Sequence, residues 1–248
     1  MSVRIHPAAF VDPGARLGVD VTIGPGAVIG PDVVIGDRTR VDSHALVTGW
    51  TTLGCDNHVH HGAVLGSAPQ DLKYLGEPSY LVVGDHSVFR EYCTANLATE
   101  PGFTTRIGSH VLMMAYSHVA HNCAIGDRVI LANAVQLAGY VVVDDWAIVG
   151  GGTVVHQFTR IGRHAMIGGG SRISQDIAPY VKAAGSPPRN AGINSIGLAR
   201  RGFSMEAVKA AERAYRLFFR DGHTVSQAVA AIRREFPGQP EEIGRAHV

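Results

Sequence analysis

Branched aliphatic residues recur at every sixth position along most of the chain. From Ile5 to Ile173 in steps of six, 26 of the 29 positions are apolar, whereas the overall apolar content of 46% would give about 13. A period of six is too short for a helical repeat but suits a short strand followed by a tight turn. The pattern therefore predicts a mainly β architecture in which three strands complete a triangular coil of 18 residues.

The positions next to the aliphatic residue are small. Glycine often follows it, as at Gly36, Gly54 and Gly108, and a small or β-branched residue stands two positions before it. We expect these glycines to supply the positive φ that a corner needs, and the aliphatic side chains to fill the interior in columns. Such an interior leaves no room for large rings, in agreement with 30 glycines and 7% aromatic residues. The chain is predicted to form a parallel β-helix of roughly nine to ten coils.

Helical signals replace the repeat near the end of the chain. Ser204 is the expected N-cap of a helix over residues 205–220. Thr224 and Gln227 are spaced as a capping box before a second helix, which is expected to end at Pro237. These two helices are predicted to form a small C-terminal α-helical cap.

The repeat and its interruptions define the expected domains. Residues 1–176 are predicted to form the β-helix, and residues 177–248 a connector with the helical cap. The repeat is interrupted near residues 66–82 and 97–106, which contain proline and glycine and are expected to be external loops. Functional groups often concentrate on such loops.

Charge and cysteine content narrow the class of protein. A net charge of +1 over 248 residues argues against a nucleic-acid-binding protein that relies on phosphate contacts. Three cysteines do not suggest a disulfide framework and fit a reducing compartment. The first ten residues lack the apolar core of a signal peptide, and no apolar run approaches the length of a membrane span. We therefore expect a cytoplasmic protein without stable membrane insertion.

An 18-residue coil places residues 18 apart in one column along an edge of the prism. His121, Gly139 and Gln157 form such a column, with His118 and His156 beside it. A neutral histidine can act as a general base, and a glycine at an open corner can present its N–H to a developing oxyanion. This column suits acyl transfer without a covalent intermediate, although most of the 13 histidines are expected to be ordinary surface or interface residues.

Four longer segments carry a resemblance to a known family. In chain order they are SAPQDLKYLGEP, MAYSHVAHNCAIGDRVILANAVQLAGYV, VGGGTVVHQFTRIG and NSIGLARRGFS. They resemble the UDP-N-acetylglucosamine O-acyltransferases of lipid A biosynthesis over nearly the whole chain, including the two-helix cap. The resemblance implies a left-handed coil, although the general crossover rule favours the right hand. It also implies a homotrimer with active sites between adjacent prisms.

The same resemblance implies an activity and residue roles. The activity is transfer of a (3R)-3-hydroxyacyl group from acyl carrier protein to the 3-position of UDP-N-acetylglucosamine, the first step of lipid A biosynthesis, with no metal and no organic cofactor. His121 would be the general base, Asn122 would orient its imidazole, and the N–H of Gly139 would stabilise the oxyanion. The implied substrate-binding residues are Gln70, Asp71, Lys73, Asn96, His118, His156, Gln157, Gly169, Asn194, Arg200 and Arg201.

Some of these binding residues also have a physical rationale. Paired arginines, Arg200 and Arg201, near a helix start suit a pyrophosphate clamp or a docking patch for an acidic carrier protein, and also an ordinary solvated basic segment. The resemblance makes Gly169 a ruler position, where a small residue leaves room for a longer acyl chain.

Four positions depart from the family pattern. Leu97 and Ala98 stand where an Arg-Gly pair is usual, Tyr140 stands where a histidine is common, and Ile196 occupies a position that can be acidic. These departures leave open whether the acceptor carries a 3-hydroxyl group or is the 3-amino analogue or another UDP-amino sugar.

Two other classes of protein also fit a histidine-rich prism. A γ-type carbonic anhydrase binds zinc through three histidines, and His118 and His121 could correspond to part of that ligand set. A non-enzymatic solenoid scaffold would need no active site. A cysteine nucleophile is not expected, because Cys123 occupies the small-residue position of the repeat and should serve packing.

Overall fold

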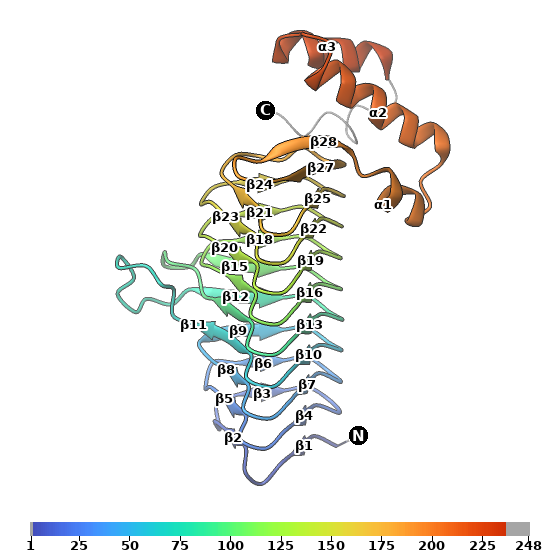
Figure 1. Ribbon diagram of the computed structural model, residues 1–248. Coiled ribbons are helices and arrows are strands. Elements are labelled where there is room, and N and C mark those ends of the chain that lie inside the picture. The colour runs from blue at the N-terminus through green and yellow to red at the C-terminus, as the bar shows by residue number, and fades with distance from the viewer. Residues whose placement is uncertain (1, 237–248) are drawn as a thin grey trace.

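The computed structural model describes residues 2–236, which form a triangular prism of three sheets with helices at one end (Figure 1). Consecutive strands belong to successive sheets, so three strands make one coil. The chain climbs from the N-terminus at the bottom of the view to the helices at the top. The fold is a left-handed parallel β-helix with short C-terminal helices, as predicted.

The strands of the coils are short, most of them two residues long. Sheet 1 contains β1 (Arg4–Ile5), β4 (Thr22–Ile23), β7 (Arg40–Val41), β10 (His58–Val59), β13 (Val88–Phe89), β16 (Leu112–Met113), β19 (Ile130–Leu131), β22 (Ile148–Val149), β25 (Met166–Ile167), β27 (Val181–Ala184) and β28 (Arg189–Ile193). Sheet 2 contains β2 (Phe10–Val11), β5 (Val28–Ile29), β8 (Leu46–Val47), β11 (Val64–Ser67), β14 (Thr94–Asn96), β17 (His118–Val119), β20 (Gln136–Leu137), β23 (Val154–Val155) and β26 (Arg172–Ile173). Sheet 3 contains β3 (Arg16–Leu17), β6 (Val34–Ile35), β9 (Trp50–Leu53), β12 (Tyr80–Val83), β15 (Thr104–Ile107), β18 (Ala124–Ile125), β21 (Val142–Val143) and β24 (Arg160–Ile161).

Strand pairing follows the 18-residue period. His118 of β17 pairs with Gln136 of β20. Around the two interruptions the offset grows: His58 pairs with Val88, 30 residues on, and Val88 pairs with Leu112, 24 residues on. The insertions thus amount to 12 and six residues beyond the 18 of a plain coil. Both are multiples of six, which is why the repeat resumes in phase after each loop.

The interior is filled as the repeat predicts, with one exception. Aliphatic and small positions such as Ile29 and Ala27 are fully buried. Phe89 is also fully buried at an aliphatic position, so the expectation that the interior excludes large rings is wrong there. Its coil carries the small Ala95 at the matching position of the next sheet, and a large residue paired with a small one keeps the core volume nearly constant.

Apart from Gly66 (φ 85°), the glycines that follow the aliphatic residue have no positive φ and do not turn the corners. Positive φ occurs three positions after the aliphatic residue, often at non-glycine residues such as Arg38 (56°) and Tyr116 (61°). Gly36 has no positive φ, but a Cβ built on it would lie 2.5 Å from the carbonyl carbon of Gly54 in the next coil. The expectation that these glycines supply positive φ is therefore wrong at every such position except Gly66. They let adjacent coils approach closely instead.

The predicted helices are present at the top of the prism (Figure 1). They are α2 (Met205–Phe219), with Ser204 as N-cap, and α3 (Val225–Glu235), which begins with a complete capping box of Thr224 and Gln227. The predicted end of the second helix at Pro237 lies outside the described residues. No helix among residues 2–236 is long and apolar enough to cross a membrane.

The expected connector carries more structure than the sequence predicted. Strand β27 adds to the parallel sheet beside β25, and β28 folds back on it in antiparallel fashion. A short helix, α1 (Ser195–Arg200), follows. The antiparallel strand and the helices close the upper end of the coil stack (Figure 1).

Candidate active site

The corner between sheet 2 and sheet 3 carries the histidine column. His121, Gly139 and Gln157 each lie two residues beyond one of the paired strands β17, β20 and β23. The N–H of Tyr140 donates to the carbonyl of His121 (3.0 Å), and the N–H of Phe158 donates to the carbonyl of Gly139 (3.2 Å). The three residues therefore stack in one column, as the 18-residue coil predicts.

The imidazole of His121 lies directly against the backbone of Gly139. A Cβ built on Gly139 would lie 2.4 Å from Cε1 and 2.6 Å from Nε2 of His121, so any larger residue would displace the ring. The N–H of Gly139 has no hydrogen-bond partner among the described residues. An N–H without a partner in this column can donate to a developing oxyanion.

Hydrogen bonds around Asn122 determine the tautomer of His121. The backbone N–H of Thr99 donates to Asn122 Oδ1 at 3.0 Å, which identifies that end of the amide as the oxygen. His121 Nδ1 lies 2.9 Å from the same oxygen. Because that oxygen can only accept, Nδ1 must carry the hydrogen and donate a hydrogen bond to it. Nε2 then carries the lone pair and can accept a proton.

Sequence reasoning missed Glu100, which stands behind Asn122. Asn122 Nδ2 donates to Glu100 Oε2 at 2.7 Å, and the hydroxyl of Tyr140 donates to Oε1 of the same carboxylate. The hydrogen bond from Tyr140 lowers the pKa of Glu100 below its ordinary value, and the Asn122 amide adds to this against the opposing effect of desolvation. A lone glutamate in a loop rich in proline and glycine carries no sequence signal beyond its place in that loop.

Tyr140 itself belongs to the site. Its ring packs edge-on against the His121 ring, with the centroids 5.4 Å apart. Desolvation, followed by the hydrogen bond to Glu100, raises the pKa of the Tyr140 hydroxyl to about 12. This departure from the family pattern therefore supplies a neutral donor to the carboxylate.

The two interrupting loops lie side by side on the same flank of the prism (Figure 1). The N–H of Gly102 donates to the carbonyl of Pro78 at 2.9 Å, and Ser79 Oγ donates to the carbonyl of Ala98 at 2.6 Å. These bonds join the β14–β15 loop to the β11–β12 loop. The predicted loops thus form one structure beside the histidine column.

The β11–β12 loop brings its polar residues to His121. Asp71 Oδ2 lies 3.9 Å from His121 Nε2. The backbone N–H of Lys73 donates to Asp71 Oδ1 (3.0 Å), while the side chains of Lys73 and Gln70 are exposed. The structure therefore places this predicted loop sequence at the histidine, with Asp71 nearest to it.

His118 and Asn96 lie on the sheet beneath the loop. His118 Nδ1 is 2.7 Å from Thr94 Oγ1, and burial, followed by the charge of His121, lowers the pKa of His118. Asn96 Nδ2 donates to the carbonyl of Ala68 at 3.2 Å and so holds the entry to the loop. Its Oδ1 is buried without a hydrogen-bond partner among the described residues.

Comparison with known proteins decides the family. Residues 14–49 match the bacterial transferase hexapeptide family (six repeats), and residues 176–244 match domain 2 of the UDP N-acetylglucosamine O-acyltransferases. The acyl-[acyl-carrier-protein]--UDP-N-acetylglucosamine O-acyltransferase of Thiobacillus denitrificans is 51% identical, over 93% of this chain and 90% of its own length. The protein of the same name from Janthinobacterium sp. (strain Marseille) is 48% identical, over 96% of this chain and 91% of its own.

The chain belongs to the UDP-N-acetylglucosamine O-acyltransferase family. Solved structures agree with this assignment. The enzyme of Acinetobacter baumannii, LpxA, superposes with a TM-score of 0.92 at 42% identity, over 96% of this chain and 93% of that one. The Arabidopsis UDP-N-acetylglucosamine acyltransferase gives 0.81 at 35% identity, over 95% and 91%. These relatives are acyltransferases, which supports neither the carbonic anhydrase nor the scaffold hypothesis.

The structure does not bring every implied binding residue of this acyltransferase to His121. His156 is exposed near the column, with Nδ1 3.0 Å from the carbonyl oxygen of Gln157. Gly169 follows β25 and lies at the corner between sheets 1 and 2. Within one described chain, the ruler position and the histidine column thus occupy different corners.

The residues predicted to meet the nucleotide lie at the third corner, between sheets 3 and 1. Arg201 Nη1 is 2.8 Å from His164 Nδ1, and its guanidinium lies over the ring of Trp146, 5.1 Å from the centroid. Burial, followed by the charge of Arg201, lowers the pKa of His164 to about 4. Arg200 is exposed in the last turn of α1. Asn194 is buried as the N-cap of that helix, and its Nδ2 donates to the His164 carbonyl.

The other departures from the family pattern lie in different surroundings. Leu97 and Ala98 are buried, and Leu97 packs in the main core, so neither side chain is available to a polar ligand. Ile196 is exposed on α1.

Cys123 is buried, its Sγ donates to the carbonyl of Ala138, and burial raises the pKa of its thiol to about 12. A thiol in this environment is unreactive, in agreement with the packing role that the repeat predicts.

Proposed function

We propose that this chain transfers a (3R)-3-hydroxyacyl group from acyl carrier protein to the 3-position of UDP-N-acetylglucosamine, the first step of lipid A biosynthesis. The names of the close relatives supply the two substrates. The observation that carries the mechanism is the state of His121. Its Nδ1–H is held by Asn122, so Nε2 is free to accept a proton next to an unpaired backbone N–H.

The proposed reaction is a direct transfer. His121 Nε2 takes the proton of the sugar 3-hydroxyl as that oxygen attacks the thioester carbonyl of the acyl carrier. The negative charge that develops on the carbonyl oxygen is stabilised by the N–H of Gly139. When the tetrahedral intermediate collapses, the C–S bond breaks and the imidazolium returns the proton to the departing thiolate. A general base contributes roughly 10²–10⁴-fold and one oxyanion donor roughly 10²–10³-fold.

Glu100 is proposed as a positioning residue for this step. Asn122 carries no charge and cannot by itself offset the imidazolium. The carboxylate of Glu100 accepts from its amide at 2.7 Å and polarises the Oδ1 that faces His121. Glu100 thus supplies a negative charge behind Nδ1 of the protonated histidine, in addition to that of Asp71 near Nε2.

The loop and sheet residues around this column are proposed to bind the acceptor sugar and the acyl donor. Asp71 Oδ2 is close enough to His121 Nε2 to contact the same sugar that gives its 3-hydroxyl proton to the histidine. Gln70 and Lys73 on the same loop present exposed polar groups, and Lys73 can pair with a phosphate. The substrate-binding roles of His118, Asn96, His156 and Gln157 rest on their place beside the column.

A homotrimer with sites between prisms is part of the proposal. Arg200, Arg201 and Asn194 lie at one corner of the prism and His121 at another. A neighbouring chain packed corner to corner can bring the basic residues of one prism to the histidine of the next. Gly169 lies at the remaining corner, and packing against a neighbouring chain would likewise bring it to the site, where it would set the length of the acyl chain.

The proposed compartment is the cytoplasm. Cys55, Cys93 and Cys123 are free thiols, which agrees with a reducing environment, and an acyl-carrier-protein donor belongs to the same compartment.

Product analysis tests the proposed function. The chain is incubated with UDP-N-acetylglucosamine and a mixed set of 3-hydroxyacyl carrier proteins, and the product is identified by mass spectrometry. We expect an ester at the 3-position, with the preferred chain length given by the most abundant product. Absence of transfer to this sugar, with transfer to its 3-amino analogue, would instead assign amide formation to the site.

A further inference from the structure

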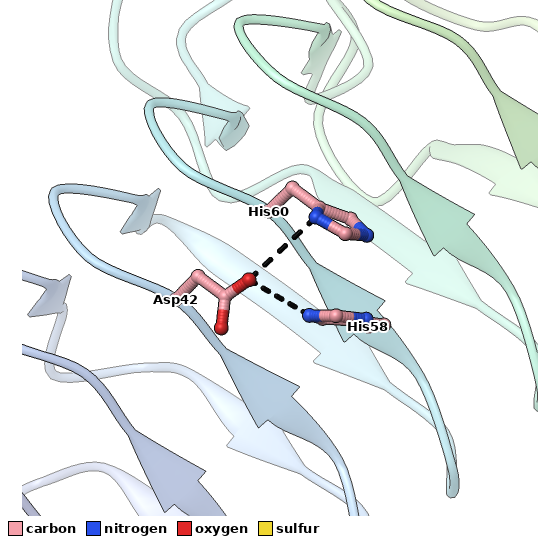
Figure 2. A group of neighbouring side chains, drawn as sticks. All are labelled: Asp42, His58 and His60. Atoms are coloured by element: carbon pink, nitrogen blue, oxygen red, sulfur yellow. Dashed lines mark hydrogen bonds and ion pairs between the residues drawn. The ribbon is translucent and has the colours of Figure 1, made fainter.

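A second cluster of histidines lies lower on the prism, several coils away from the histidine column. Asp42 and His60 each follow directly after a strand, β7 and β10, and His58 is within β10 (Figure 2). These strands pair side by side, so the cluster joins two adjacent coils. Among the described residues, these are three histidine and acidic side chains whose possible ligand atoms all lie within 4.8 Å of one another.

The two imidazoles converge on one carboxylate oxygen of Asp42. His58 Nε2 lies 2.8 Å and His60 Nδ1 3.6 Å from Asp42 Oδ2 (Figure 2). The two imidazoles stack with centroids 3.7 Å apart, and each has a nitrogen within 4.8 Å of the other two possible ligand atoms. At zinc–ligand distances of about 2.0–2.2 Å, two ligands of a tetrahedral ion lie roughly 3.3–3.5 Å apart. The observed separations bracket that value.

Neighbouring side chains hold the Asp42 carboxylate in place and add a second carboxylate beside His60. Arg40 Nε donates to Asp42 Oδ1 at 2.6 Å, which fixes the carboxylate and leaves Oδ2 directed at the two histidines. The Arg40 side chain is 62% exposed, so water and salt screen its charge. Glu91 Oε1 lies 3.7 Å from His60 Nδ1 and can approach as a fourth ligand. The cluster borders a surface hollow that can hold water ligands.

We propose that Asp42, His58 and His60 bind one divalent transition-metal ion of the Zn²⁺ class. Two imidazole nitrogens and one carboxylate oxygen form a ligand set typical of zinc, with water or Glu91 completing the coordination. Because Asp42 belongs to one coil and the two histidines to the next, the ion cross-links adjacent coils. This site is separate from the proposed reaction at His121, and it departs from our expectation of a protein without metal.

Metal binding can be measured directly on the purified full-length chain. The protein is stripped with a chelator and titrated with Zn²⁺ in competition with a chromophoric chelator of known affinity. We expect one ion per chain at this site with micromolar or tighter affinity, and at least a tenfold weaker affinity in Asp42→Asn and in His60→Gln. Zn²⁺ should also raise the melting temperature of the wild type, because it binds the folded state, and this shift should shrink in both variants.

A matched control separates this site from ordinary surface histidines. His86 stacks on His110 and lies 3.9 Å from Asp56, but it belongs to no cluster of three ligands among the described residues. His86→Gln should bind Zn²⁺ as the wild type does. The proposal is overturned if the wild type binds no Zn²⁺ more tightly than about 100 μM, or if the control and both cluster variants bind it equally. Should Asp42→Asn fail to fold, His60→Gln gives the same decision.

Discussion

At the scale of single residues, the site depends on how one imidazole is held. His121 is fixed by three neighbours. Asn122 accepts a hydrogen bond from its Nδ1–H, the Gly139 backbone packs against its ring, and the Tyr140 ring makes an edge-to-face contact with it. Glu100 ties Asn122 and Tyr140 together through one carboxylate. Apart from the N–H of Gly139, which is proposed to contact the oxyanion, these neighbours are expected to act through the position and charge of the histidine rather than through substrate contacts.

Replacing Glu100 with glutamine should lower kcat about tenfold and leave KM nearly unchanged. Such a loss is equivalent to about 1.4 kcal/mol, a typical value for one charge-assisted hydrogen bond. Steady-state kinetics on the purified variant measures it. The exposed Glu212→Gln on α2 is the control and should behave as the wild type. A loss confined to KM would contradict the positioning role.

The same Glu100 variant has a pH signature. The pKa of Glu100 is lowered in the folded protein, chiefly by Tyr140, so its carboxylate stabilises the fold above the pKa of the unfolded chain. That contribution is lost as the pH falls through the lowered value. The difference in free energy of unfolding between wild type and Glu100→Gln should therefore be present at pH 7 and disappear in acid. A difference that grows on acidification would show that the sign is wrong.

Gly139→Ala should inactivate the site without unfolding the prism. The added Cβ would meet the His121 ring at 2.4 Å, so the ring must move, and a displacement of about 1 Å can cost about 10²-fold in rate. The control is Gly152→Ala, where a Cβ meets no atom within 4 Å and where Ala134 already occupies the equivalent corner one coil below, with positive φ. Equal activity of the two variants would refute the contact argument.

At the scale of elements, the fold depends on how closely successive coils approach. The repeat predicted the strands and the buried columns, because every coil obeys the same six-residue pattern. It could not predict why glycine follows the aliphatic residue, since that reason lies in the neighbouring coil. The β27–β28 pair and α1 were missed because they follow no repeat, and α1 has six residues, too few for a helical period to emerge.

Gly36→Ala tests the spacing of the coils. Its Cβ would lie 2.5 Å from the backbone of Gly54, so the coils must separate, and we expect a loss of about 1–3 kcal/mol in the free energy of unfolding. Urea denaturation of Gly36→Ala and the wild type measures this loss. A Gly36→Ala chain as stable as the wild type would show that close approach is not the reason for glycine at this position.

At the scale of the whole molecule, the sequence placed the histidine column correctly because residues 18 apart must stack. It could not assign residues to corners relative to a second chain. Arg201 packs on Trp146 at one corner, while His121 lies at another. Glu100 was missed because its role depends on how a loop folds back over the coil.

Mixed oligomers test whether one site draws on two chains. His121→Ala and Arg201→Ala chains, each impaired alone, are coexpressed and purified together. If sites lie between chains of a trimer, some sites in random hybrids combine an intact histidine with an intact arginine, and activity should recover to about a quarter of wild type. The hybrids should sediment as a trimer of three 26.3 kDa chains. Activity no higher than that of the separate variants would place both residues in one chain's site.

The central claim is that His121 is the base of acyl transfer. The most direct measurement is the rate of ester formation by His121→Ala with UDP-N-acetylglucosamine and a 3-hydroxyacyl carrier protein, on protein whose circular dichroism and oligomeric state match the wild type. We predict a loss of about 10²–10⁴-fold in kcat. A correctly folded variant that retains kcat within about threefold of the wild type would contradict the assignment of His121 as the general base.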